Sequence, residues 1–172
     1  VYNKLKAKSL TPTEKSIIAL GVAYGLQELH SKEILHLDLK PKNILLNKDN
    51  YPLICDFGLS FQREKLDEYI DFLLIGSFPY IAPEILENQK DKIGKKCDIF
   101  SFGVILYNLL TNRQMFSKGI ELDITKEEVT YKYEDGERPS IKKYLNTDPQ
   151  ICELIEKCWQ TDPDDRPTIS EI

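Results

Sequence analysis

The sequence has no apolar run that approaches the roughly 20 residues needed to cross a bilayer. Its first ten residues, VYNKLKAKSL, also lack the apolar stretch of a signal peptide. We therefore expect no membrane segment in this chain. An excess of positive charge is missing as well, because the formal net charge is −5 and the pI is about 5.2. We expect no nucleic-acid partner, and the basic cluster KIGKK at 92–96 is more simply a solvated helix start.

Closely spaced cysteines are also absent. The four cysteines form no C-x-x-C pair, and they are Cys55, Cys97, Cys152 and Cys158. We interpret them as buried reduced thiols, which favours an intracellular, cytoplasmic protein.

The composition is that of a globular protein, with 41% hydrophobic and 30% charged residues. A length of 172 residues suits one domain. The chain begins without Met and stops at TISEI inside a helical pattern. We therefore expect it to be part of a longer protein.

The segment TPTE at 11–14 has the pattern of a capping box followed by helical spacing of apolar residues. It predicts a helix over residues 12–31. Gly21 and Gly25 lie inside this helix and lower its propensity, so we expect another backbone to approach closely there.

Other elements follow from similar patterns. NILL and PLIC surround the turn NKDNY and predict a β-hairpin. The run CDIFSFGVILYNLLT at 97–111 is apolar on nearly every side, which indicates a buried central helix. Residues 112–148 predict loops with one or two short helices, and residues 148–160 predict an amphipathic helix that Asp148 caps.

The segment HLDLKPKN carries three side chains of different chemistry, Asp38, Lys40 and Asn43. A carboxylate that orients a hydroxyl, a cation near phosphate and an amide that ligates a divalent cation together suit phosphoryl transfer. The hairpin returns the chain to a second carboxylate, Asp56 of DFG, and Asn43 with Asp56 suits Mg²⁺. Taken alone, Asp38 and Asn43 are more simply turn formers.

Five motifs in order resemble the C-terminal lobe of a eukaryotic protein kinase over essentially all 172 residues. They are HLDLKPKN, DFG, APE at 82–84, DIFSFGVIL and RP at 166–167. The resemblance implies an α+β fold that is mainly α, with a small β-hairpin and no N-terminal lobe. It makes residues 1–172 a partial protein kinase domain that is truncated at both ends.

The resemblance also implies roles for residues of the loop and the DFG turn. Asp38 would accept or orient the proton of the substrate hydroxyl, and Lys40 would neutralise charge on the γ-phosphate. Asn43 and Asp56 would hold Mg²⁺ or Mn²⁺. ATP would bind with its adenine ring packed on Leu45.

Three further residues would be structural in such a lobe. His36 and Phe57 would stack in the apolar column that links the two lobes of an active kinase. Asp98 would hold the backbone of the catalytic loop from the central helix. Without the resemblance, His36 is more simply a satisfied structural histidine.

The activation segment would contribute to docking of the substrate. Ala82, Pro83 and Glu84 would close this segment, and Ser77 would line the substrate-docking loop. Glu84 would form a buried ion pair with Arg166. These two residues lie 82 positions apart, and spacing alone would not pair them.

Two sequence features indicate which group of protein kinases the chain resembles. Lys40 in DLKPKN, together with Ser77, is typical of serine/threonine kinases. The ending CWQTDPDDRPT resembles tyrosine kinases and the tyrosine-kinase-like group of serine/threonine kinases. Both signals fit the tyrosine-kinase-like group.

Leu37 departs from the family pattern, which commonly has Arg at this position to collect a phosphate from the activation segment. Between Gly58 and Gly76 the only hydroxyl side chains are Ser60 and Tyr69. We therefore expect a kinase that is not switched by the usual contact of phosphate with arginine.

The sequence contains no glycine-rich phosphate loop, no strand lysine and no partner glutamate of the N-terminal lobe. Two functions remain open. The first is an enzyme that transfers phosphate from ATP to Ser or Thr of protein substrates, in which this chain alone would have negligible activity. The alternative is an inactive kinase lobe that serves as a scaffold or interaction module.

Overall fold

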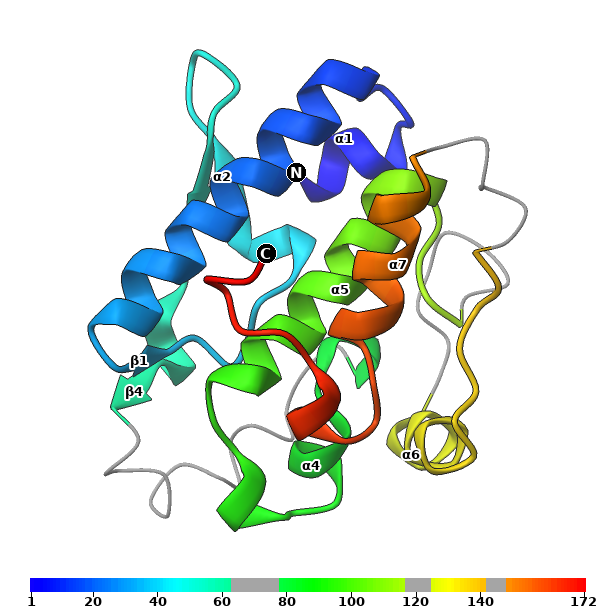
Figure 1. The fold of residues 1–172 in the computed structure, drawn as a ribbon. Coiled ribbons are helices and arrows are strands. Elements are labelled where there is room, and N and C mark those ends of the chain that lie inside the picture. Colours follow the sequence, from blue (N-terminus) through cyan, green and yellow to red (C-terminus); the bar gives the residue numbers. More distant parts are fainter. Residues whose placement is uncertain (63–77, 117–124, 142–147) are drawn as a thin grey trace.

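The computed structural model describes residues 1–62, 78–116, 125–141 and 148–172. Two long helices, α2 (Pro12–Ser31) and α5 (Lys95–Thr111), lie against each other. Helix α7 (Pro149–Cys158) packs on α5. Figure 1 shows these three helices at the centre of the molecule, with the small strands at one side of α2. The prediction of a mainly α fold is confirmed.

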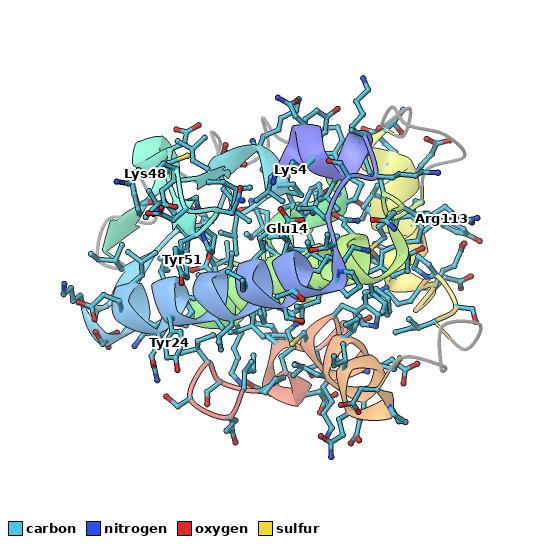
Figure 2. All side chains as sticks on the ribbon, turned by 90° about the horizontal axis from the view of Figure 1, so that it is seen from above. Lys4, Glu14, Tyr24, Lys48, Tyr51 and Arg113 are labelled. Carbon is cyan, nitrogen blue, oxygen red and sulfur yellow. The ribbon has the colours of Figure 1, made fainter. Side chains whose placement is uncertain are left out.

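Helix α2 begins with the predicted capping box. The Thr11 side chain accepts from the Glu14 N–H at 3.2 Å, and Glu14 Oε2 accepts from the Thr11 N–H at 2.9 Å. Lys4 of the short helix α1 (Tyr2–Lys6) bonds Glu14 at 2.8 Å, so that α1 is joined to the start of α2 (Figure 2). The predicted span of α2 is therefore confirmed.

The predicted hairpin is formed by β2 (Ile44–Leu46) and β3 (Pro52–Ile54), with Leu45 opposite Leu53. It packs on α2 at the two glycines. A Cβ on Gly21 would lie 2.3 Å from Pro52 Cγ, and one on Gly25 would lie 2.7 Å from Ile54 Cδ1. Strand β3 therefore packs closely on α2 at these glycines, as expected, and the atoms nearest to them belong to the side chains of Pro52 and Ile54.

Helix α5 is buried on nearly every side, as the apolar run indicated. A Cβ on Gly103 would lie 2.6 Å from the Cβ of Cys158 on α7, so this glycine allows close packing of the two helices. Helix α7 has the predicted cap, because Asp148 Oδ1 accepts from the Gln150 N–H at 2.9 Å. Both helix predictions are confirmed.

The remaining elements are short. Strand β1 (Ile34–Leu35) pairs antiparallel with β4 (Phe61–Gln62), and two further helices are α4 (Pro83–Leu86) and α6 (Lys126–Glu134). Short 3₁₀ turns lie at 41–43, 57–59, 78–80, 90–92 and 163–165. Helix α6 is the short helix expected in the region 112–148. In the part of the chain that the structure describes, no helix is long and apolar enough to cross a membrane.

All four cysteines are free thiols. Cys97, Cys152 and Cys158 are buried, as expected. Cys55 is only half-buried, so the prediction of burial is wrong for this residue, which immediately precedes the exposed Asp56.

Candidate active site

The loop between β1 and β2 is hydrogen-bonded to one carboxylate of α5. Asp98 Oδ2 accepts from the His36 N–H at 3.0 Å, and Asp98 Oδ1 accepts from the Leu37 N–H at 2.8 Å. Asp98 is fully buried, so these bonds have no competition from water. The structure thus places Asp98 where it can fix the loop backbone.

Asp98 has a third partner that the sequence interpretation missed. His30, at the end of α2, lies with Nε2 2.9 Å from Asp98 Oδ2. His30 continues the buried stripe of α2 at spacings of four, after Ile18, Val22 and Leu26. The sequence signal for this contact was a polar residue, His30, at the end of an otherwise apolar stripe.

The histidine of the loop connects it to the DFG turn. His36 Nδ1 accepts from the Asp38 N–H at 3.3 Å, and Nε2 donates to the Cys55 carbonyl at 3.2 Å. These partners require the neutral imidazole with its proton on Nε2. The His36 ring also lies 5.3 Å from the Phe57 ring. The two rings expected to stack are therefore in contact.

Asp38, Lys40 and Asn43 form one cluster. Lys40 Nζ lies 2.7 Å from both carboxylate oxygens of Asp38, and Asn43 Nδ2 donates to Asp38 Oδ2 at 2.8 Å. Asn43 Nδ2 also donates to the Asp38 carbonyl at 2.9 Å. The side chains of Asp38 and Lys40 are 15% and 17% exposed, so both are partly open to solvent. This places a carboxylate, a cation and an amide within one hydrogen-bonded group.

The DFG turn follows β3. Asp56 has a left-handed backbone (φ 66°) and an exposed side chain, and it directly precedes the 3₁₀ turn Phe57–Leu59. Leu45 and its cross-strand partner Leu53 are each 54% exposed. Leu45 is therefore an exposed apolar side chain on the hairpin.

The side chains of Asn43 and Asp56 carry oxygen atoms, the ligand type that a small hard cation prefers. In residues 1–62, 78–116, 125–141 and 148–172, no three His, Cys, Asp or Glu side chains come together to hold a metal by themselves. Both hydrogen bonds of the Asn43 amide use its nitrogen, which leaves the amide oxygen for another ligand. An amide oxygen and a carboxylate, such as those of Asn43 and Asp56, are ligand types that Mg²⁺ takes, and this ion needs few protein ligands.

Glu84 and Arg166 form a buried bidentate pair. Arg166 Nη1 and Nη2 donate to the two Glu84 oxygens at 2.7 and 2.8 Å, and both side chains are at most 1% exposed. The other three N–H groups of Arg166 donate to the carbonyls of Lys96, Gln160 and Thr161. All five guanidinium donors are therefore satisfied.

Cys97 is a partner of this pair that the sequence interpretation missed. Its thiol donates to Glu84 Oε1 at 3.0 Å, and burial together with the Glu84 charge raises the pKa of the thiol well above its usual value. Ala82 and Pro83 are buried at the start of α4, with Pro83 at the first helical position. Ser77 and Tyr69 lie outside the described residues.

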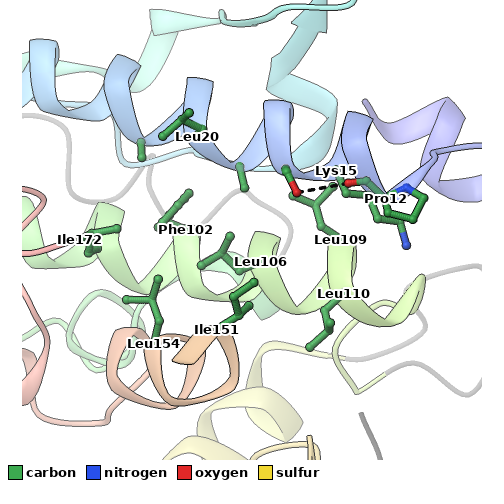
Figure 3. Close-up of a pocket in the computed structure, with 13 residues that line it drawn as sticks. Pro12, Lys15, Leu20, Phe102, Leu106, Leu109, Leu110, Ile151, Leu154 and Ile172 are labelled. Carbon is green, nitrogen blue, oxygen red and sulfur yellow. Dashed lines mark hydrogen bonds between the residues drawn. The ribbon is translucent and has the colours of Figure 1, made fainter. Parts of the chain in front are cut away.

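An apolar groove of about 500 Å³ lies elsewhere, between α2, α5 and α7 (Figure 3). Its described lining residues include Leu20, Phe102 and Leu154, and none belongs to the loop 36–43. The groove is therefore separate from the cluster around Asp38.

The loop thus holds a carboxylate, a cation and an amide in one hydrogen-bonded group beside the DFG turn. The protein kinase domain model matches residues 2–172, and the chain belongs to this family. A probable serine/threonine-protein kinase SIS8 of Arabidopsis thaliana is 37% identical over 158 residues, which cover 90% of this chain and 14% of that protein. The serine/threonine-protein kinase VIK of the same plant is 34% identical over 180 residues, which cover the whole chain and 39% of that protein.

A third relative comes from an animal. Mitogen-activated protein kinase kinase kinase 7 of Drosophila melanogaster is 38% identical over 156 residues, which cover 90% of this chain and 21% of that protein. The chain thus spans between 14% and 39% of the length of these three kinases.

Proposed function

We propose that this chain is the C-terminal lobe of a serine/threonine kinase of the tyrosine-kinase-like group, which transfers the γ-phosphate of ATP to Ser or Thr of intracellular proteins. The cluster of Asp38, Lys40 and Asn43 carries this proposal. An interaction module has no need to hold a carboxylate, a cation and an amide in one accessible group.

Asp38 supplies the group that acts on the substrate hydroxyl. Its carboxylate accepts the hydrogen bond of the incoming hydroxyl, orients the oxygen for attack and receives the proton. Lys40, which already lies 2.7 Å from both Asp38 oxygens, offers its positive charge to the phosphoryl group as negative charge develops. Asp98 keeps the loop in place during this step through its bonds to the His36 and Leu37 amides.

Asn43 and Asp56 are the residues that would hold Mg²⁺ or Mn²⁺. The ion supplies charge neutralisation on the phosphates of ATP when it is bound. Protein kinases generally use ATP and Mg²⁺, and Leu45 offers an exposed apolar surface for the adenine ring. Ala82, Pro83 and Glu84, with Ser77, would position the protein substrate.

The test is transfer of radioactive phosphate from ATP labelled at the γ position to dephosphorylated casein by the full-length protein, followed by phosphoamino-acid analysis. Wild-type protein should label Ser and Thr. Asp38→Asn should lower the rate by about 10²–10⁴-fold, because the general base is lost. The exposed Asp91→Asn is the matched control and should keep the wild-type rate.

If wild-type protein bound casein without labelling it, the proposed enzymatic function would be wrong and the scaffold function would be favoured. Labelling confined to Tyr would overturn the proposed specificity.

A further inference from the structure

Residues 78–80 form a 3₁₀ turn that ends one residue before the APE motif, and α5 fixes this turn at Tyr80. The Tyr80 hydroxyl donates to Asn108 Oδ1 at 2.7 Å. The Ser101 hydroxyl donates to the Tyr80 carbonyl at 2.7 Å. Pro79 and Tyr80 are both buried, so these bonds lie away from water.

A second helix fixes the same turn from another direction. The hydroxyl of Tyr133, on α6, donates to the Pro79 carbonyl at 2.7 Å. Successive carbonyls of the turn therefore accept hydroxyl donors from two different helices, Tyr133 on α6 and Ser101 on α5. The Pro79 carbonyl belongs to the peptide unit between Pro79 and Tyr80, and the Tyr80 carbonyl to the next unit, so the two bonds fix the directions of two successive peptide planes.

The Tyr133 ring has little freedom to move. It is fully buried and meets the Phe100 ring edge-on at 5.2 Å, while the Arg138 guanidinium lies 4.5 Å from its centre. Arg138 is itself held, because its Nε donates to the Trp159 carbonyl at 3.0 Å. Burial raises the pKa of the Tyr133 phenol, so the hydroxyl remains a donor throughout the physiological pH range.

We propose that Tyr133 is a positioning residue that sets the docking affinity for the protein substrate, by holding the Pro79 carbonyl and with it the turn 78–80. This inference rests on the proposed kinase function, in which the residues around APE receive the substrate. Tyr133 acts only through the turn and is separate from Asp38, Lys40 and the metal ligands. Loss of the Tyr133 hydroxyl therefore changes the binding of the peptide substrate and leaves the phosphoryl-transfer step unchanged.

The experiment compares Tyr133→Phe with wild type in the full-length protein. The variant keeps the buried ring and removes one hydrogen bond. Using a serine/threonine peptide selected from a degenerate library, the KM for the peptide should rise about fivefold, as expected for one buried hydrogen bond. The kcat and the KM for ATP should stay within twofold of wild type.

Hydrogen–deuterium exchange provides a second measurement that needs no activity. The Ile81 amide donates to the Phe78 carbonyl at 3.0 Å and closes the turn. Its exchange should become faster in Tyr133→Phe. The control is Val22→Ala, which removes buried methyl groups from α2 and lowers stability without removing a bond to the turn.

An unchanged peptide KM, or an equal rise in Val22→Ala, would overturn the role in substrate docking. If wild-type protein transferred no phosphate, only the proposed kinase function would be wrong. The exchange rate of the Ile81 amide would still test whether Tyr133 positions the turn, because an unchanged rate in Tyr133→Phe would contradict that role.

Discussion

At the scale of single residues, Arg166 has a hydrogen-bond partner for each of its guanidinium donors. Its five N–H groups all donate, two of them to the buried Glu84 carboxylate. Glu84→Gln should lower the free energy of unfolding by about 3–5 kcal/mol, because it leaves the Arg166 charge buried without its counter-charge. Thermal and urea melts of Glu84→Gln, Arg166→Met and the double variant measure this effect.

The double variant gives the decisive comparison for this pair. Its loss should be clearly smaller than the sum of the two single losses, since each single change strands the partner. Additive losses would contradict the energetic coupling of Glu84 and Arg166.

Leu37 supports a prediction about regulation. Its side chain is 5% exposed, and its backbone (φ 60°) is fixed by the N–H bond to Asp98. A buried hydrocarbon cannot bind a phosphate, so activity of the full-length protein should not depend on phosphate in the activation segment. Phosphatase treatment followed by a peptide assay measures this directly.

The Leu37 prediction would be wrong if activity fell tenfold or more, about 1.4 kcal/mol in barrier, and returned on rephosphorylation of Ser60 or Tyr69. Ser60→Ala serves as a comparison, because the Ser60 hydroxyl donates to the His36 carbonyl at 3.2 Å and a phosphate there would remove this bond.

At the scale of elements, the cap of α2 allows a matched test. Thr11→Ala removes the side-chain acceptor of the capping box and should lower the free energy of unfolding by about 1 kcal/mol. Thr13→Ala changes an exposed threonine two positions later and should have an effect below about 0.5 kcal/mol. Urea denaturation of both variants gives the comparison, and equal losses would show that the cap does not stabilise α2.

The sequence predicted elements with strong local signals and missed those without them. Caps and apolar period predicted α2 and α7, and a continuous apolar run predicted α5, because these signals lie within or directly beside the element itself. The pairing of β1 with β4 was not predicted, since two-residue strands carry no period. The start of α6 could have been predicted, because Thr125 and Glu128 form a second capping box.

At the scale of the whole molecule, residue spacing predicts contacts within one loop but does not predict contacts between distant segments. The group of Asp38, Lys40 and Asn43 is local and was accessible from the spacing in one loop. Glu84 and Arg166 were paired only through the family resemblance. The contact of Tyr133 with Pro79 could not be predicted, because neither periodicity nor a motif links α6 to the turn.

The central claim is that Asp38, Asn43 and Asp56 form one phosphoryl-transfer site. The most direct measurement is the rate of phosphate transfer from ATP by the full-length protein as Mg²⁺ is titrated, for wild type, Asp56→Asn and the exposed control Asp49→Asn. The account predicts no transfer without divalent cation, a rate for Asp56→Asn lower by about 100-fold or more at saturating Mg²⁺, and unchanged thermal stability. Asp49→Asn should match wild type. A wild-type rate and Mg²⁺ dependence in Asp56→Asn would contradict the account.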